Sequence, residues 1–304
     1  MAQPKPSSHP FAGVLVPVLT PFGADYEPRA ELFVEFCRSL LDQGAGGLAV
    51  FGTTSEANSM SVRERRGLLA ALLEGGLDPY RLMPGTGAAA LPEAVELTRA
   101  AVEAGAGGVL LLPPFYYKNV PEDGVFAYFA EVIERVGDQR LKVFLYHIPQ
   151  VSAVPVTPDI VARLVDRFGQ TIAGLKDSSG EWGNTATLLS RSPQLAIFPG
   201  SERFLLQGLA AGAPGCISAT ANYDVGLIRK VIETPDGPER ERLARRMLAI
   251  RTAFEKHPVI PALKFVQARR SGDPAWKTVR PPLRPLSEEA GQTLLAALQA
   301  AESD

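Results

Sequence analysis

The sequence is poor in cysteine and histidine, and each shortage excludes a class of protein. The 304 residues contain two cysteines, Cys37 and Cys216, and three histidines, His9, His147 and His257. Two cysteines supply neither a disulfide framework nor a cysteine-based zinc site, and three scattered histidines do not make a histidine-rich metal centre. The cysteine count favours a reducing compartment, so we expect a cytoplasmic protein.

An excess of charge and long hydrophobic runs are also lacking. Lys and Arg number 31 against 33 Asp and Glu, a net charge of −2, which argues against a nucleic-acid partner or a polybasic membrane surface. No apolar run approaches the roughly 18 residues of a transmembrane helix. Residues 1–10, MAQPKPSSHP, are polar and proline-rich, unlike a signal peptide, and are predicted to be a disordered tail.

Hydrophobic residues make up 46% of the chain, enough for a sizeable core, and many of them fall in eight short runs. Continuous apolarity, rather than alternation, is typical of strands that are covered on both faces. The predicted strands span residues 14–20, 47–51, 81–85, 108–113, 142–147, 172–176, 195–199 and 215–219.

Segments with helical spacing of apolar residues separate these runs. One begins at Leu32, and another follows Thr157 and Pro158, a good N-cap and a helix-starting proline. Strict alternation of strands and helices indicates a parallel sheet, and eight pairs in about 220 residues fit a (β/α)₈ barrel. The competing open sheet usually carries a glycine fingerprint after its first strand, and TPFGADY (20–26) lacks it.

The last part of the chain differs from the rest, because its apolar spacing predicts helices with no strands between them. The expected helices lie at about 243–254, 261–272 and from 287 to the end. We therefore expect a barrel over residues 11–234 and a helical region over 235–304 that packs on it, the two acting as one unit.

Active sites of such barrels lie at the carboxyl ends of the strands, where Lys176 ends the run IAGLK. It is the one lysine of eight that ends an apolar strand. Desolvation there favours the neutral amine, which attacks ketones to form a Schiff base. The alternative is a structural lysine that reaches solvent or pairs with a carboxylate such as Asp177.

Tyr146 ends the neighbouring predicted strand, and its phenol could pass protons to and from a carbinolamine on Lys176. The turn Gly52-Thr53-Thr54 offers successive backbone N–H groups and hydroxyls, which suit a carboxylate. Taken singly, the tyrosine could be a packing residue and the turn an ordinary polar turn. Glu56, just beyond the turn, is expected to be structural.

Six motifs in order give the chain a resemblance to a known family. They are GTTSEA (52–57), GTG (85–87), PPFYY (113–117), LYHIP (145–149), GLKDSSG (174–180) and GCISATAN (215–222). Together they resemble the dihydrodipicolinate synthase and N-acetylneuraminate lyase family of class I, Schiff-base-forming aldolases, over nearly the whole chain.

The resemblance implies a (β/α)₈ barrel with C-terminal helices, usually a homotetramer built as a dimer of dimers, with no metal or organic cofactor. It implies that Lys176 forms the Schiff base with a 2-oxo acid, typically pyruvate, and that Tyr146 is the acid and base. Thr53 would link Tyr146 to Tyr116, which in synthase-type members comes from the partner subunit.

The resemblance also assigns the binding residues. Gly52, Thr53 and Thr54 would hold the carboxylate of the oxo acid, and the backbone carbonyl of Ile217 would border the substrate. An aldehyde would be the second reactant or the second product.

Departures from the family pattern bear on the substrate. Synthases carry an arginine shortly after the tyrosine motif, which binds the second substrate's carboxylate, and counting from Tyr146 this chain has Val151 there. Arg191 or Arg203 could substitute from other loops. Ser55 replaces the usual glycine, and His147 a frequent asparagine. KDSSG resembles the aldolases of keto-deoxy sugar acids or of 4-hydroxy-2-oxoglutarate more than the synthases.

The leading hypothesis is therefore a lyase that cleaves or condenses a pyruvate-type 2-oxo acid with an aldehyde. The alternatives are 4-hydroxy-tetrahydrodipicolinate (dihydrodipicolinate) synthase, a sugar-acid dehydratase of the same family, and a catalytically silent binding protein. The loops after the last two predicted strands carry no glycine-rich phosphate cradle, which argues against a phosphate-binding barrel enzyme.

Overall fold

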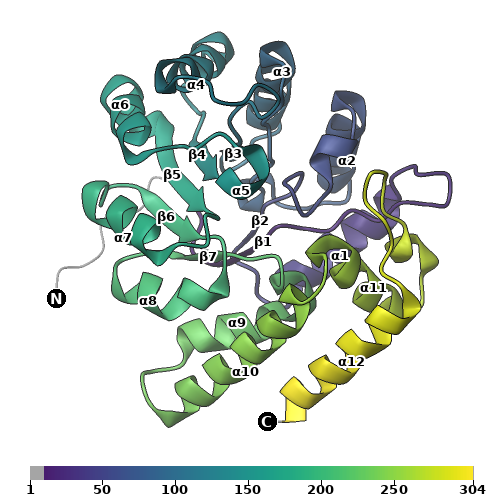
Figure 1. Ribbon diagram of the computed structural model, residues 1–304. Coiled ribbons are helices and arrows are strands. Elements are labelled where there is room, and N and C mark those ends of the chain that lie inside the picture. The colour runs from purple at the N-terminus through teal and green to yellow at the C-terminus, as the bar shows by residue number, and fades with distance from the viewer. Residues whose placement is uncertain (1–9, 304) are drawn as a thin grey trace.

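The computed structural model describes residues 10–303, and its strands alternate with helices along the chain. The predicted tail at 1–10 lies outside the described residues, apart from Pro10. The strands are β1 Gly13–Val16, β2 Gly47–Leu48, β3 Val109–Leu111, β4 Val143–His147, β5 Ile172–Asp177, β6 Ala196–Pro199 and β7 Gly215–Ile217. All paired strands are parallel, in the orders β2-β1-β7 and β3-β4-β5-β6. The chain is a (β/α)₈ barrel with its strands at the centre (Figure 1).

The predicted strand at 81–85 is not a regular strand. In its place the structure has two isolated β-bridges, Leu48 to Leu82 and Gly85 to Leu110, which connect β2 to β3. The backbone N–H of Met83 donates to Leu48 O at 2.8 Å, and that of Leu110 donates to the carbonyl of Pro84 at 2.9 Å. Pro84 has no N–H to give a ladder, so this segment closes the wall without forming continuous pairing.

Prolines and glycines also shorten other predicted strands. The run predicted at 14–20 forms β1 only as far as Val16, because Pro17 has no N–H for the ladder. The run predicted at 47–51 is paired regularly only at Gly47–Leu48, and Phe51 already has a positive φ of 59°. The chain leaves the barrel wall early at both places and forms the loops of the rim.

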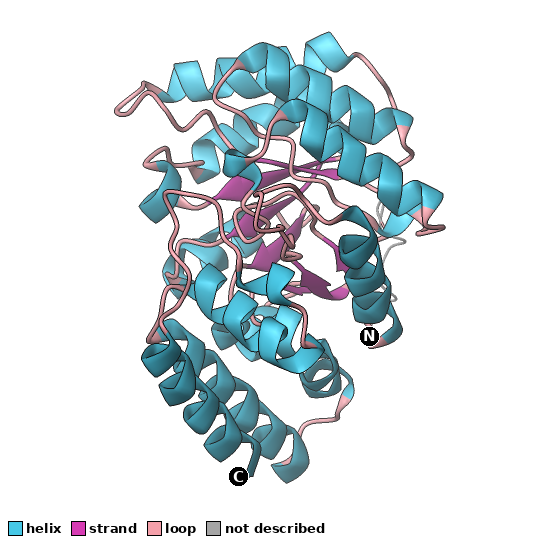
Figure 2. Cartoon of the chain, turned by 90° about the vertical axis from the view of Figure 1, so that its right-hand side faces the viewer, coloured by secondary structure: helices cyan, strands magenta, loops and turns pink. Residues whose placement is uncertain are grey.

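Helices surround the strands on the outside (Figure 2). The α-helices from the first strand to the helix that follows β7 are α1 Ala30–Asp42, α2 Val62–Glu74, α3 Leu91–Glu103, α4 Glu122–Val136, α5 Pro149–Ser152, α6 Pro158–Phe168, α7 Trp182–Arg191, α8 Leu205–Ala210 and α9 Ala221–Glu233. Short 3₁₀ helices are η1 Ala57–Ser59, η2 Pro79–Arg81, η3 Gly169–Thr171, η4 Glu202–Phe204 and η5 Pro274–Lys277. The predicted N-cap of α6 is confirmed, since the Thr157 side chain accepts the Ile160 N–H.

Three helices follow without strands between them, as predicted: α10 Pro238–Glu255, α11 Val259–Ser271 and α12 Glu288–Ser303. Helix α10 packs against α9, and α12 lies beside α10 (Figure 1). Within residues 10–303, no helix combines the length and the apolar character needed to cross a membrane.

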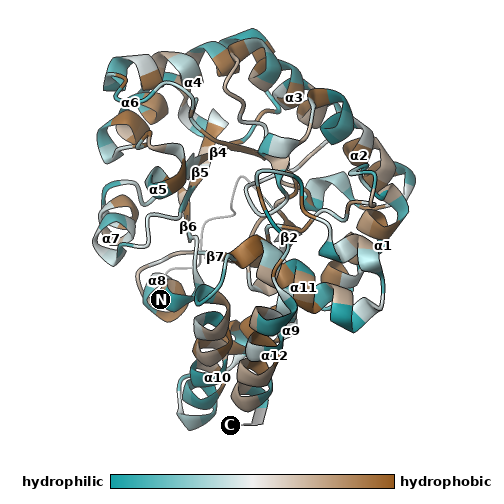
Figure 3. Ribbon diagram, turned by 45° about the vertical axis from the view of Figure 1, so that its right-hand side comes forward, coloured by the Kyte–Doolittle hydropathy of each residue, from teal (hydrophilic) through white to brown (hydrophobic). Residues whose placement is uncertain are grey.

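The helices around the strands carry both hydrophobic and hydrophilic residues (Figure 3), and the buried apolar residues form an inner and an outer layer. The inner layer fills the barrel and receives a residue from each of the eight predicted strand segments, including Met83 from the irregular one. The outer layer lies between strands and helices, and one of its clusters runs from Val16 and Leu48 to Phe254 and Leu298 of the C-terminal helices. Polar side chains gather near the carboxyl ends of β4 and β5, at one end of this inner layer.

Candidate active site

Lys176 and Tyr146 lie side by side inside the barrel, near the carboxyl ends of β5 and β4. The parallel register pairs the two residues directly, so both side chains point to the same face. Lys176 Nζ donates to Tyr146 Oη at 3.4 Å and lies 4.5 Å from the centroid of its ring. Only 5% of Lys176 and 4% of Tyr146 are exposed. The predicted closeness of the two side chains is confirmed.

Lys176 does not form the ion pair with Asp177 that was the alternative reading. Adjacent residues of a strand point to opposite faces, and Asp177 turns outward. Its carboxylate accepts the Ser179 N–H at 3.0 Å, the Asn184 amide at 3.0 Å and the Thr185 hydroxyl at 2.6 Å. In the described part of the chain, no carboxylate lies within ion-pair distance of Lys176. Its amine therefore faces a phenol instead of an anion.

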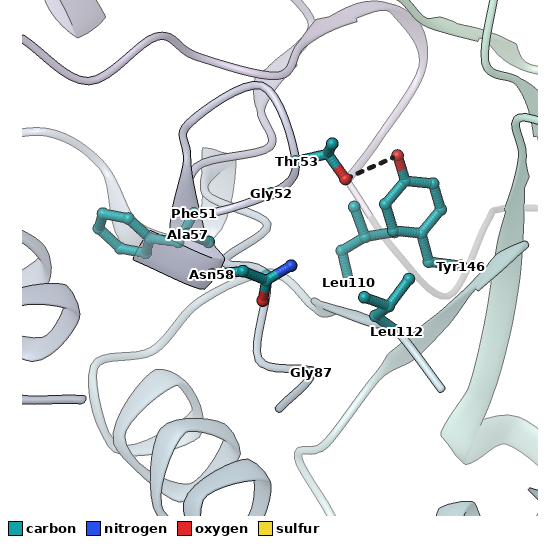
Figure 4. Close-up of a pocket in the computed structure, with 10 residues that line it drawn as sticks. Phe51, Gly52, Thr53, Ala57, Asn58, Gly87, Leu110, Leu112 and Tyr146 are labelled. Atoms are coloured by element: carbon teal, nitrogen blue, oxygen red, sulfur yellow. Dashed lines mark hydrogen bonds between the residues drawn. The ribbon is translucent and has the colours of Figure 1, made fainter. Parts of the chain in front are cut away.

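Thr53 joins this pair from the loop after β2. Its hydroxyl Oγ1 lies 3.4 Å from Tyr146 Oη, and either atom can be the donor (Figure 4). The loop is tightly wound, because Phe51 and Glu56 both have positive φ, at 59° and 57°. Such a conformation costs a residue with a side chain about 1 kcal/mol or more and persists only where surrounding contacts impose it. Thr53, Tyr146 and Lys176 thus form a continuous polar chain.

The same loop exposes unused backbone donors. The N–H groups of Ser55 and Ala57 turn back to Gly52 O, both at 3.2 Å, and the Glu56 N–H to Thr53 O at 3.0 Å. Among residues 10–303, no acceptor is bonded to the backbone N–H of Thr53 or Thr54. A Cβ placed on Gly52 would meet no atom within 4 Å, so there is space over the turn. Two free N–H groups beside open space suit a carboxylate.

A small open pocket lies beside this loop (Figure 4). Tyr146 and Thr53 form part of its wall, and the Asn58 side chain projects toward them from η1. The remaining lining residues are Phe51, Gly52, Ala57, Gly85, Gly87, Leu110 and Leu112. Sequence reasoning did not single out Asn58. Its position four residues beyond the predicted turn Gly52–Thr54 and its polar side chain are the signals that could have found it.

Arg65 holds the far wall of this pocket and was also missed. Its guanidinium donates to the carbonyl of Gly85, and more weakly to that of Gly87 at 3.5 Å. Only 4% of the residue is exposed, and burial lowers the pKa of Arg65 to about 10. Arg65 precedes Leu68, Leu69 and Leu72 at helical spacing, so a charge on the buried face of a helix was visible in the sequence.

Ile217 and Tyr116 occupy different environments. Ile217 ends β7, and its side chain packs in the barrel interior with Tyr146. Tyr116 is 73% exposed, and its ring packs edge-on against Tyr117 on the loop after β3. Within the described chain Tyr116 makes no hydrogen bond to Thr53, so one chain alone does not complete the predicted Thr53–Tyr116 link.

The three departures from the family pattern, Val151, His147 and Ser55, lie in different surroundings. Val151 lies on α5 and is 58% exposed. The His147 ring turns away from Lys176, and its Nδ1 accepts the Val156 N–H at 3.0 Å. Burial lowers the pKa of His147. Ser55 donates its hydroxyl to Val18 O at 2.5 Å, which ties the substrate loop to the segment after β1.

Arg191 and Arg203, the two candidates for a replacement cation, lie elsewhere. Arg191 ends α7 and pairs with Asp159 at 2.7 Å on the outer ring of helices. Arg203 pairs with Glu255 of α10. Neither arginine lines the pocket. Neither arginine therefore replaces the cation that synthases have at the position of Val151.

A buried lysine beside a tyrosine phenol, at the carboxyl ends of barrel strands, defines a Schiff-base-forming lyase of the class I aldolase type. The chain belongs to the dihydrodipicolinate synthetase family, whose model matches residues 10–301.

Individual relatives match the chain along nearly its full length. An uncharacterized DapA-like lyase of Chloroflexus aurantiacus is 38% identical over 304 residues, which cover 98% of this chain and 97% of that protein. Dihydrodipicolinate synthase from Agrobacterium tumefaciens str. C58 is 33% identical, with a TM-score of 0.87, covering 95% of this chain and 99% of that one. YagE, a prophage protein from E. coli K12 solved in complex with pyruvate, has a TM-score of 0.88 at 24% identity, covering 96% and 99%, and shares the fold.

Proposed function

We propose that this protein joins or separates a pyruvate-type 2-oxo acid and an aldehyde through a Schiff base on Lys176. The observation that carries the proposal is the buried chain Lys176–Tyr146–Thr53, in which the amine has a phenol partner at 3.4 Å and no carboxylate partner among the described residues. An amine in this setting is accessible as a nucleophile without first breaking an ion pair.

The proposed reaction begins with attack of the Lys176 amine nitrogen on the ketone carbon. Tyr146 gives a proton to the carbinolamine oxygen, which leaves as water, and the iminium forms. Tyr146, now a phenolate, takes a proton from the carbon next to the iminium, which gives an enamine. The enamine attacks the aldehyde carbon and forms the new C–C bond, and the aldehyde oxygen takes the proton back from Tyr146. Water then releases the product from Lys176, and the reverse sequence describes cleavage.

Binding of the oxo acid is assigned to the loop after β2. The free N–H groups of Thr53 and Thr54, together with their hydroxyls, would hold the carboxylate over Gly52. We place the Ile217 carbonyl at the border of the bound substrate, since Ile217 ends β7 and its side chain belongs to the same interior cluster as Tyr146. The complex of YagE with pyruvate supports pyruvate as the oxo acid.

Assembly and location are part of the proposal. Tyr116 is exposed in the single chain and would extend the Thr53–Tyr146 chain from a partner subunit, within a homotetramer. A cytoplasmic location is supported by Cys37 and Cys216, which are both free and buried.

The second candidate is 4-hydroxy-tetrahydrodipicolinate synthase, and the likeness to the Agrobacterium enzyme favours it. Val151 argues against it, because an exposed valine cannot bind a second carboxylate where synthases use arginine. A keto-deoxy sugar acid aldolase whose aldehyde product has no carboxylate needs no cation at that place, whereas a 4-hydroxy-2-oxoglutarate aldolase would have to hold its second carboxylate elsewhere. A sugar-acid dehydratase would use the same Schiff base, and a silent binding protein would use none.

A substrate panel tests these alternatives. We expect pyruvate release from 4-hydroxy-2-oxo acids or keto-deoxy sugar acids, poor turnover of pyruvate with aspartate semialdehyde, and a gain in the latter with Val151→Arg. Lys176→Ala is the inactive control. Dehydrated products without C–C cleavage would indicate the dehydratase, efficient wild-type synthesis would indicate the synthase, and ligand binding without turnover would contradict an enzymatic role.

A further inference from the structure

Glu56 connects the substrate loop to the C-terminal helical region. Both oxygens of its carboxylate are occupied by residues more than 200 positions away: Lys264 Nζ donates to Oε1 at 2.5 Å, and the Arg280 backbone N–H donates to Oε2 at 2.9 Å. The Glu56 and Lys264 side chains are fully buried. This contact is the deepest ion pair among the described residues.

Arg280 reinforces the connection with its side chain. The guanidinium donates to the carbonyl of Ser59 at 2.6 Å and pairs with Glu64 of the α2 capping box. Both cations lie over the Phe22 ring, with Lys264 Nζ at 4.4 Å and Arg280 Cζ at 4.6 Å from its centroid. Arg280 therefore contacts both ends of the stretch 56–64, Glu56 through its backbone and Glu64 through its side chain.

Hydrogen bonds connect Glu56 to the proposed catalytic residues. The Glu56 N–H donates to Thr53 O at 3.0 Å, the Thr53 hydroxyl contacts Tyr146, and Tyr146 contacts Lys176. Glu56 has a positive φ of 57°, which a residue with a side chain keeps only under external restraint. Lys264 and Arg280 supply that restraint from α11 and the segment after it.

Stability alone is a poor reason for the Glu56–Lys264 pair. Removing two charges from water costs about as much as their attraction returns, and apolar residues of similar volume often serve as well. Burial lowers the pKa of Lys264 to about 8, and the Glu56 carboxylate opposes that shift. An arrangement this costly points to a requirement for a defined loop geometry.

We propose that Lys264 and Arg280 are positioning residues, which act through Glu56 to hold the free N–H groups of Thr53 and Thr54 in register with Lys176. This inference rests on the proposed function and assigns the C-terminal region a part in it. The restraint serves recognition of the substrate carboxylate, so it matters for ketones that carry one and much less for ketones that do not.

The test compares borohydride trapping of two ketones on the full-length protein. Pyruvate carries the carboxylate, and hydroxyacetone does not. For Lys264→Met we expect the trapping rate with subsaturating pyruvate to fall about tenfold or more, as for a misplaced binding group, while the rate with hydroxyacetone stays within about twofold. Glu56→Gln should show the same selective loss. Glu288→Gln removes two exposed ion pairs of the C-terminal region, with Arg269 and Lys277, and should change neither rate.

Equal losses with both ketones, or no loss with either, would overturn the proposal, because a purely structural role does not distinguish them. If Lys264→Met does not fold, as judged by circular dichroism, the same ratio measured on Glu56→Gln decides the question. Absence of any adduct on the wild type with either ketone would instead contradict the proposed function itself.

Discussion

Tyr146 is the residue through which the other polar groups of the site meet. Its hydroxyl lies 3.4 Å from both Lys176 Nζ and Thr53 Oγ1, so it can pass a proton in either direction. We expect Tyr146→Phe to fold normally and to lose about 10²- to 10⁴-fold in kcat, the usual contribution of a general acid and base. Steady-state kinetics on a substrate from the panel checks this, and a kcat within threefold or so of the wild type would remove Tyr146 from the mechanism.

His147, one position along, has a different task. Its neutral ring accepts the Val156 N–H, and burial lowers the pKa of His147 below its ordinary value of 6.5. As the pH falls below that value the unfolded chain takes up a proton that the folded chain resists. The contribution of His147 is therefore complete above about pH 6.5 and declines as the pH falls from there toward the lowered pKa.

His147→Asn should remove this dependence, because an asparagine carbonyl can accept the same N–H without titrating. We expect the loss of unfolding free energy between about pH 7.5 and pH 5.5 to be larger for the wild type than for the variant. Urea denaturation at both pH values measures it. Parallel losses in the two proteins would show that His147 stays neutral or is not coupled to folding.

The residues that sequence reasoning placed correctly are those at strand ends. Lys176 and Tyr146 were predicted to be neighbours because successive parallel strands lie side by side, and the register pairs them. Arg65 and Asn58 were missed, because their roles depend on where a helix and a 3₁₀ turn bring them against Gly85 and Thr53. Periodicity predicts which face is buried and does not reveal which carbonyl a buried arginine reaches.

At the scale of elements, the irregular segment 82–87 is as important as the regular strands. It joins β2 to β3 and lies directly against the substrate loop, with Arg65 bonded to its carbonyls. A Cβ on Gly85 would lie 2.2 Å from the carbonyl oxygen of Phe51, which is backbone and cannot rotate away. The absence of a side chain at Gly85 therefore sets the distance between this segment and Gly52.

Gly85→Ala should accordingly push the substrate loop outward. We expect it to reduce the unfolding free energy by about 1–3 kcal/mol, as overpacking does, and to raise KM for the oxo acid. Gly124→Ala in α4 is the matched control, since its Cβ meets no atom within 4 Å, and alanine should stabilise that helix by up to about 1 kcal/mol. Equal stability and equal KM for the two variants would contradict the close-packing account.

Most elements were predictable for a physical reason. Continuous apolar runs indicate strands covered on both faces, and helical spacing of apolar residues indicates the helices that cover them. The start of α6 is indicated by Thr157 as N-cap and Pro158 as first residue. Which residues of each predicted strand would form regular hydrogen-bonded pairs was not predictable. Pro17 and Pro84 can adopt the extended backbone of a strand, but they lack the N–H group that a strand donates to its neighbour. The short α5 and α8 carry too few residues for a periodic signal.

At the scale of the whole molecule, the barrel and the C-terminal helices share one apolar cluster and the buried Glu56–Lys264 pair. We propose that residues 11–234 and 235–304 form one cooperative unit with the boundary near α10. The continuity of the core and the contact with the substrate loop support this view. On this proposal, the C-terminal helices support the substrate loop as well as the fold.

Assembly is the second property at this scale, and Tyr116 tests it. If Tyr116 acts across a subunit interface, Tyr116→Ala and Lys176→Ala proteins are each impaired, yet hybrids made by mixing and reassociating them regain activity. Such hybrids contain sites with an intact Lys176 and an intact Tyr116 from the neighbouring subunit. No recovery in hybrids verified by native mass spectrometry would place Tyr116 outside a shared site.

The measurement that bears most directly on the whole account is the location of a trapped adduct. The wild-type protein is incubated with pyruvate and borohydride, digested, and analysed by peptide mass spectrometry, with Lys176→Arg treated in parallel. The account predicts a reduced pyruvate adduct on the peptide that contains Lys176 and none on that peptide in the variant. An unmodified Lys176 in the wild type, or an adduct confined to another lysine, would contradict it.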